Sequence, residues 1–211
     1  MKKITLLLFV AISYQFSATA QADKFTAAMA ATLQQYGQAK DAEVLTAVAA
    51  KFERIGDAEK TQWLPYYYAA LIKATMSMQG WGGDKDKVAD DAQTLLTKAE
   101  AIEKNSELYC IESMVATAKM LVDPQGRYMQ YMNAMNGSLE TAKKTDPTNP
   151  RPYMLQSVNL KNTPEQFGGG CSTAKPLAQK ALALYEAFKP LSSLHPNWGK
   201  ERVEAVIADC K

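Results

Sequence analysis

The chain has 211 residues, of which 47% are hydrophobic, and it carries 24 basic and 22 acidic residues for a formal net charge of +2. A chain of this length can bury one sizeable core. Its near-neutral balance, with no basic cluster, excludes the electrostatic footprint that nucleic-acid binding requires, so we expect no nucleic-acid partner.

The first twenty residues have the three parts of a cleavable secretory signal. Residues 2–3 are lysines, residues 4–12 are almost entirely apolar, and Ala-Thr-Ala stands at residues 18–20. An apolar run this short cannot span a bilayer as a helix. We therefore predict cleavage after Ala20 and export to the periplasm or beyond. Residues 21–211 would form one domain with no membrane span and with 22 basic residues against 22 acidic ones, because the signal removes two lysines.

The remainder of the chain has the pattern of an all-α protein. Amphipathic stretches alternate with Gly and Pro clusters, and no long run of alternating β-branched residues predicts a sheet. We expect helices near residues 23–36, 41–55, 61–78, 86–104, 106–121, 126–144, 150–160, 172–188 and 198–209.

A 43-residue period relates the central helices. Gly83, Gly126 and Gly169 have this spacing. The same spacing connects five further sets, namely Leu96, Leu139 and Leu182; Ala92, Met135 and Ala178; Ala99, Ala142 and Tyr185; Lys104, Pro147 and Pro190; and Tyr67, Cys110 and Tyr153. This self-similarity predicts helix hairpins that bury their apolar faces by stacking on one another.

The repeated unit resembles the tetratricopeptide repeat (TPR), whose second helix has a small residue, a large apolar residue four later and a small residue three beyond. Residues 92–99, 135–147 and 178–190 carry this pattern. Residues 52–68 and 164–169 are also similar to exported bacterial repeat proteins of this type, a group without an assigned activity. The resemblance implies a TPR-like α-solenoid of antiparallel helix hairpins with a C-terminal capping helix, and a binding role.

The chain departs from that family in its repeat length. The family's period is about 34 residues, and the additional residues here fall between the two helices of each unit, at Gln79–Lys85, Val122–Gly126 and Asn162–Cys171. Insertions at equivalent places emerge on one edge of a solenoid, where loops commonly carry binding.

Three cysteines are present, and an exported chain meets an oxidising compartment. Cys171 begins a predicted helix and Cys210 ends the last one, so an antiparallel return would bring them together as a disulfide. Two alternatives stay open, namely unpaired buried thiols and a nucleophilic pair of Cys171 with His195. We expect Cys110, at a repeat core position, to be a buried free thiol.

The other candidate chemistry has a simpler structural interpretation. Residues 168–170 are three glycines that could cradle a phosphate, but they lack the Walker spacing and suit helix capping. Met129, Met132 and Met135 have a spacing that could hold Cu(I), but methionine commonly fills helical cores. His195 is the only histidine, which excludes the usual His-rich metal sites. We predict no catalytic residue, no metal site and no cofactor.

Four aromatic residues are the candidates for binding a partner: Trp63, Tyr66, Tyr68 and Trp81. Three consecutive tyrosines at residues 66–68 cover most of a helix's circumference, so we expect at least one of Tyr66 and Tyr68 to face away from the core. Trp81 lies between two glycines and could anchor a peptide or a sugar, or fold back onto the helices.

The resulting hypothesis is a non-enzymatic exported scaffold that binds a protein or peptide partner. The alternative is a carrier of a small ligand, a sugar or a metal. A third hypothesis is a hydrolase that uses Cys171, against which the missing histidines and carboxylate pairs count.

Overall fold

The computed structural model describes residues 22–210, and the predicted signal at residues 1–20 lies outside this range. Residues 22–38 are helical, and no strand occurs in the described part of the chain. The further elements are α2 (Ala42–Glu59), α3 (Leu64–Gln79), α4 (Lys85–Glu100), α5 (Ser106–Met120), α6 (Pro124–Thr145), α7 (Arg151–Lys161), the short 3-10 helix η1 (Glu165–Phe167), α8 (Cys171–Ala187) and α9 (Lys200–Asp209). The all-α expectation is therefore confirmed.

Polar caps explain where several helices begin. The side chain of Asp41 accepts a hydrogen bond from the backbone N–H of Val44 at 2.8 Å. Asp84, Asn105 and Asp123 do the same for α4, α5 and α6. Each cap satisfies a backbone donor that the first turn of a helix leaves without a partner.

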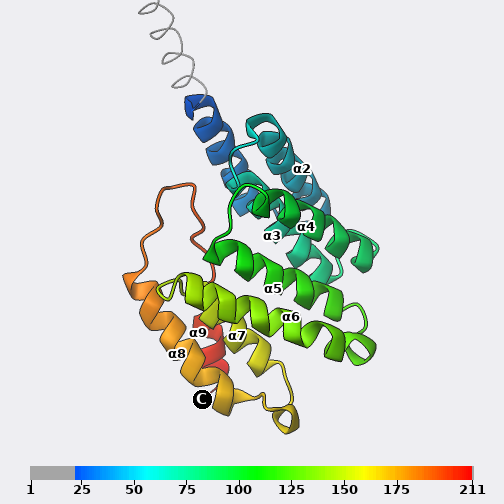
Figure 1. Cartoon of the computed structure of the whole chain (residues 1–211), viewed down its shortest axis with the longest axis vertical. Helices are drawn as coiled ribbons and strands as arrows, with labels where there is room; N and C mark the ends of the chain where they lie inside the picture. Colours follow the sequence, from blue (N-terminus) through cyan, green and yellow to red (C-terminus); the bar gives the residue numbers. More distant parts are fainter. Residues whose placement is uncertain (1–21, 211) are drawn as a thin grey trace, which may run out of the picture.

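The helices follow one another along the longest axis of the molecule in approximate chain order (Figure 1). Each helix from α2 to α9 packs against the next one along the chain, while α5 also contacts α3 and α7, and α7 contacts α9. No helix of the described residues is long and apolar enough to cross a membrane.

Helix α3 lies at the centre of the N-terminal half, and 12 of its 16 residues are buried. Tyr66, Tyr67 and Tyr68 are exposed by only 6%, 0% and 4%. The expectation that Tyr66 or Tyr68 faces away from the core is wrong. The reason is that α3 packs against α2, α4 and α5. The loop after α8 covers a further side of α3, and there the carbonyl of Leu194 accepts a hydrogen bond from the Tyr68 hydroxyl.

Several positions of the 43-residue frame lie in contacts between helices, whereas Gly83, Gly126, Lys104 and Pro147 are exposed. Leu96 and Leu139 have no exposed surface. The alanines of the frame are equally buried, at positions 92, 99, 142 and 178. Small residues at these crossing points allow close approach, and the leucines fill the space between neighbours.

Candidate functional site

An apolar groove lies between the first half of α6 and the loop that follows α7. We call it the α6 groove, and its volume is about 890 Å³. The residues that line it are Thr117, Met120, Leu121, Pro124, Gln125, Tyr128, Met129, Met135, Asn159, Asn162, Thr163, Pro164 and Phe167. None of these described lining residues carries a charge, and thioether, aromatic and aliphatic groups dominate. A concave apolar site of this size is typical of small-molecule binding.

Unequal helix lengths create the groove. α6 has 22 residues and its neighbour α7 has 11, so α6 extends about 16 Å beyond α7 at 1.5 Å per residue. The first half of α6 therefore has no full helix beside it on this side. The loop at residues 162–170, at the lower edge of Figure 1, forms the opposite wall instead.

The groove carries exposed apolar side chains. Five large hydrophobic residues of the described chain are exposed, and two of them, Met129 at 75% and Phe167 at 67%, line this groove. Exposed apolar side chains gathered around one concavity mark an interaction site more often than scattered ones do.

The loop that carries Phe167 is closed at its neck. The backbone N–H of Gly170 donates to the carbonyl of Leu160 at 2.9 Å, and that of Gly169 donates to Pro164 at 3.2 Å. A Cβ at position 169 would lie 2.0 Å from the carbonyl oxygen of Thr163, so only glycine fits there. The two ends of the loop therefore lie next to each other, and the loop is a compact turn.

A second cavity of about 740 Å³ lies at the other end of α6, and its lining, unlike that of the α6 groove, includes charged side chains. Its lining includes the carboxylates of Glu103, Glu107 and Asp146 together with Trp63 and His195. Exposed Leu191, at 87%, also lines it. Burial lowers the pKa of His195.

Glu107, one of the residues that line this second cavity, belongs to a buried ion pair. The guanidinium of Arg151, which has no exposed side-chain surface, donates to Glu107 Oε1 at 2.8 Å. Asn149 donates to the same oxygen at 2.7 Å, and the Tyr67 hydroxyl donates to Oε2 at 3.2 Å. Burial raises the pKa of the Glu107 carboxyl, and the charge of Arg151 opposes that rise. Because protein groups already satisfy Glu107, this network holds α5, α7 and the loop after α8 together.

The candidate partner-binding residues lie away from the α6 groove. The hydroxyl of buried Tyr66 donates to Asp57 at 2.8 Å, and Tyr68 bonds to Leu194, so both rings support the fold and present little surface. Trp63 is half-buried at the second cavity and packs edge-on against Tyr67. Trp81 is exposed by 39%. A partner contact at Trp63 or Trp81 stays a prediction.

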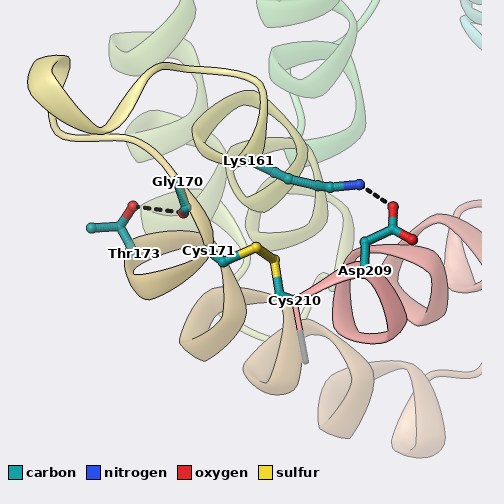
Figure 2. The surroundings of a disulfide bond; sticks show 6 residues. All are labelled: Lys161, Gly170, Cys171, Thr173, Asp209 and Cys210. Carbon is teal, nitrogen blue, oxygen red and sulfur yellow. Dashed lines mark hydrogen bonds and ion pairs between the residues drawn. A yellow bond between two sulfur atoms is a disulfide. The ribbon is translucent and has the colours of Figure 1, made fainter.

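Cys171 and Cys210 form a disulfide, the pairing that the sequence analysis favours (Figure 2). Their Cα atoms are 5.2 Å apart. Cys171 is therefore not a free nucleophile, and the only hydrogen bond of the His195 ring in the described chain is with Ser192, at 2.9 Å. Cys110 is buried and free, as expected.

The α6 groove was not among the sites expected from the sequence, but two sequence features point there. Two of the three insertions, Val122–Gly126 and Asn162–Cys171, supply lining residues. The methionine spacing is the second signal, because Met129 and Met135 both line the groove. Helical periodicity favoured a core role for all of these methionines, whereas Met129 is largely exposed because α7 ends too early to cover it.

The fold and groove together define an all-helical protein with an apolar, ligand-sized concavity. The structure is similar to that of the HusA haemophore from Porphyromonas gingivalis, with a TM-score of 0.78 and 32% sequence identity. The match covers 92% of this chain and 94% of that one. No family model matches the chain, and no curated protein matches it. At this identity and coverage the chain belongs to the family of the HusA haemophore.

Proposed function

We propose that this protein binds haem, or a closely related tetrapyrrole, in the α6 groove. The observation that carries the proposal is an uncharged apolar groove of about 890 Å³ in a relative of a haemophore, a protein named for carrying haem. The small-ligand alternative of the sequence analysis is thus better supported than its main hypothesis of a protein-binding scaffold.

The chemistry of the groove suits a flat apolar macrocycle. Phe167 and Tyr128 supply aromatic faces, and Met120, Met129 and Met135 supply polarisable thioethers that adapt to a planar ring. Uncharged walls would leave the two carboxylates of haem at the open edge of the groove, where water solvates them.

The described lining of the α6 groove contains no histidine to ligate the haem iron. Thioether and phenol groups are the donors that the described groove offers to iron, while His195 lies in the second cavity. Burial of the macrocycle against apolar side chains therefore supplies most of the binding free energy.

The second cavity is a poorer haem site. Its carboxylates at Glu103 and Asp146 would repel the negative carboxylates of haem. The basic Lys189 offsets only part of that charge.

The broader proposal is an exported, non-enzymatic carrier. The Cys171–Cys210 disulfide supports export, because such bonds persist in oxidising compartments. The TPR-like stacking of the helix hairpins also stays a proposal, supported by the burial of the alanines of the frame and of Leu96 and Leu139.

Titration of the purified protein with haem, followed by absorbance and by quenching of tryptophan fluorescence, tests the function. Phe167→Ala and Met129→Ala remove exposed groove side chains that the fold does not need. Each variant should weaken haem binding by about 1–2 kcal/mol, or roughly 5- to 30-fold in Kd, because an apolar contact with the macrocycle is lost.

Leu191→Ala is the matched control, since it removes an apolar side chain that is even more exposed and lines the second cavity. It should leave the Kd unchanged. A loss with Leu191→Ala and none with the groove variants would move the ligand to the second cavity. Absence of saturable haem binding by the intact protein would refute the proposed function.

A further inference from the structure

The loop at residues 162–170 forms one wall of the α6 groove. The residue before it and the residue after it are each connected to one of two neighbouring residues, Asp209 and Cys210. Before the loop, Lys161 at the end of α7 forms an ion pair with Asp209. After the loop, Cys171 at the start of α8 is bonded to Cys210. Figure 2 shows both connections converging on the end of α9.

Helix α9 is itself anchored in the body of the protein. It packs against α7 and α8, and its side chains Val203 and Val206 are exposed by 0% and 3%. Cys210 is exposed by 3%. The C-terminal residues therefore present a fixed point to which the two ends of the loop are attached.

The wall residue Phe167 depends on these connections more than on packing of its own. Phe167 is 67% exposed, and η1, which contains it, has no buried residue. Within the loop, hydrogen bonds such as Gly168 N–H to the carbonyl of Glu165 at 2.9 Å set its local shape. At the neck, the bond from Gly170 N–H to the carbonyl of Leu160 ties the loop to α7, and the disulfide and the ion pair add connections to α9 at the same place.

We propose that the Cys171–Cys210 disulfide, assisted by the Lys161–Asp209 ion pair, positions the Phe167 wall for ligand binding. In this assignment Cys171, Cys210, Lys161 and Asp209 are positioning residues that act through Phe167 and touch no ligand. The inference rests on the proposed haem site, since it concerns one wall of that groove. Opening the bond would let the loop move away from α6 and widen the groove.

A double-mutant cycle between Phe167→Ala and the pair Cys171→Ser with Cys210→Ser tests the assignment, with the haem Kd as readout. In the disulfide-bonded protein, Phe167→Ala should raise the Kd by about tenfold. In the serine background the same change should raise it by less than about twofold, because the ring no longer contacts the ligand. A global loss of stability would not produce this non-additivity. Leu191→Ala, the control substitution, should have no effect in either background.

Hydrogen exchange on the ligand-free protein supplies an independent readout. In the serine variant, amides of residues 162–170 should exchange faster while those of α3 and α5 keep their protection. Asp209→Ala retains the disulfide, so it gives a second variant if the serine protein does not fold. It should raise the Kd by about two- to threefold, and the ion-pair-preserving Asp209→Glu should not.

Additive effects of Phe167→Ala in both backgrounds, or unchanged exchange of the loop amides, would overturn the positioning role. If the intact protein fails to bind haem, the proposed function fails. The exchange experiment still decides whether the disulfide holds the loop.

Discussion

Replacing Arg151 by methionine should destabilise the protein in a manner that depends on pH. Arg151 has no exposed side-chain surface and faces Glu107 at 2.8 Å. Its guanidinium also lies over the rings of Phe188 and Trp198, at 4.7 and 5.6 Å from the ring centroids, and donates to the carbonyl of Pro196. Methionine has a similar length and can occupy the apolar part of this space, but it leaves the Glu107 carboxylate buried without its cation.

The magnitude follows from the cost of an uncompensated buried charge. Removing one member of a buried ion pair costs about 3–5 kcal/mol. Tyr67 and Asn149 still donate to Glu107 in the variant, so we expect the lower value, about 3 kcal/mol. For a chain of this size, that loss lowers the melting temperature by roughly 6–12 °C.

The pH dependence has a defined sign. Burial already raises the pKa of Glu107, and removal of Arg151 removes the charge that opposes the rise. A carboxyl whose folded-state pKa exceeds its unfolded value contributes stability that is present below the unfolded pKa and is lost as pH rises through the folded pKa. The loss caused by Arg151→Met should therefore be larger at about pH 8 than at about pH 5.

Thermal unfolding followed by circular dichroism at both pH values measures the effect. Adding Glu107→Gln to Arg151→Met removes the orphaned charge, so it should recover about half of the lost stability and remove the added pH dependence. Arg202→Met, a half-buried arginine whose guanidinium is 5.7 Å from the centroid of the Trp198 ring, is the matched control and should cost less than about 1 kcal/mol. The reasoning would be refuted if Arg151→Met lost equal stability at both pH values, or if Glu107→Gln worsened it.

Two glycines and one cysteine give further predictions. Gly169→Ala should cost about 1–3 kcal/mol and weaken haem binding, because its Cβ would meet the Thr163 carbonyl. On α6, a Cβ at Gly137 would meet nothing within 4 Å, so Gly137→Ala should instead stabilise the protein by about 0.5–1 kcal/mol. Chemical denaturation of both variants measures the two changes in stability. Equal changes would show that contact with the Thr163 carbonyl does not destabilise Gly169→Ala. Burial raises the pKa of the Cys110 thiol, so a thiol reagent should label no cysteine in the native, unreduced protein and one in denaturant. Rapid native labelling would show that Cys110 is accessible.

The sequence by itself determined the helical composition and much of the core. Capping residues such as Asp41 and Asn105 act within one turn, so local sequence places the helix starts. The 43-residue frame located buried positions such as Leu96 and Leu139, while Leu182 at the same spacing is only partly buried. The approach of Cys171 to Cys210 also followed from an antiparallel return of short helices.

Only the tertiary structure shows where an apolar groove of ligand size lies. The α6 groove exists because α7 has only 11 residues and lies beside a helix twice as long. The spacing of the methionines cannot show which of them α7 leaves uncovered. The burial of Tyr66 and Tyr68 and the pairing of Arg151 with Glu107 likewise depend on helices distant in sequence and on the loop after α8. Local periodicity reports which face of a helix is apolar, whereas the number of neighbours around that helix is a property of the assembled fold.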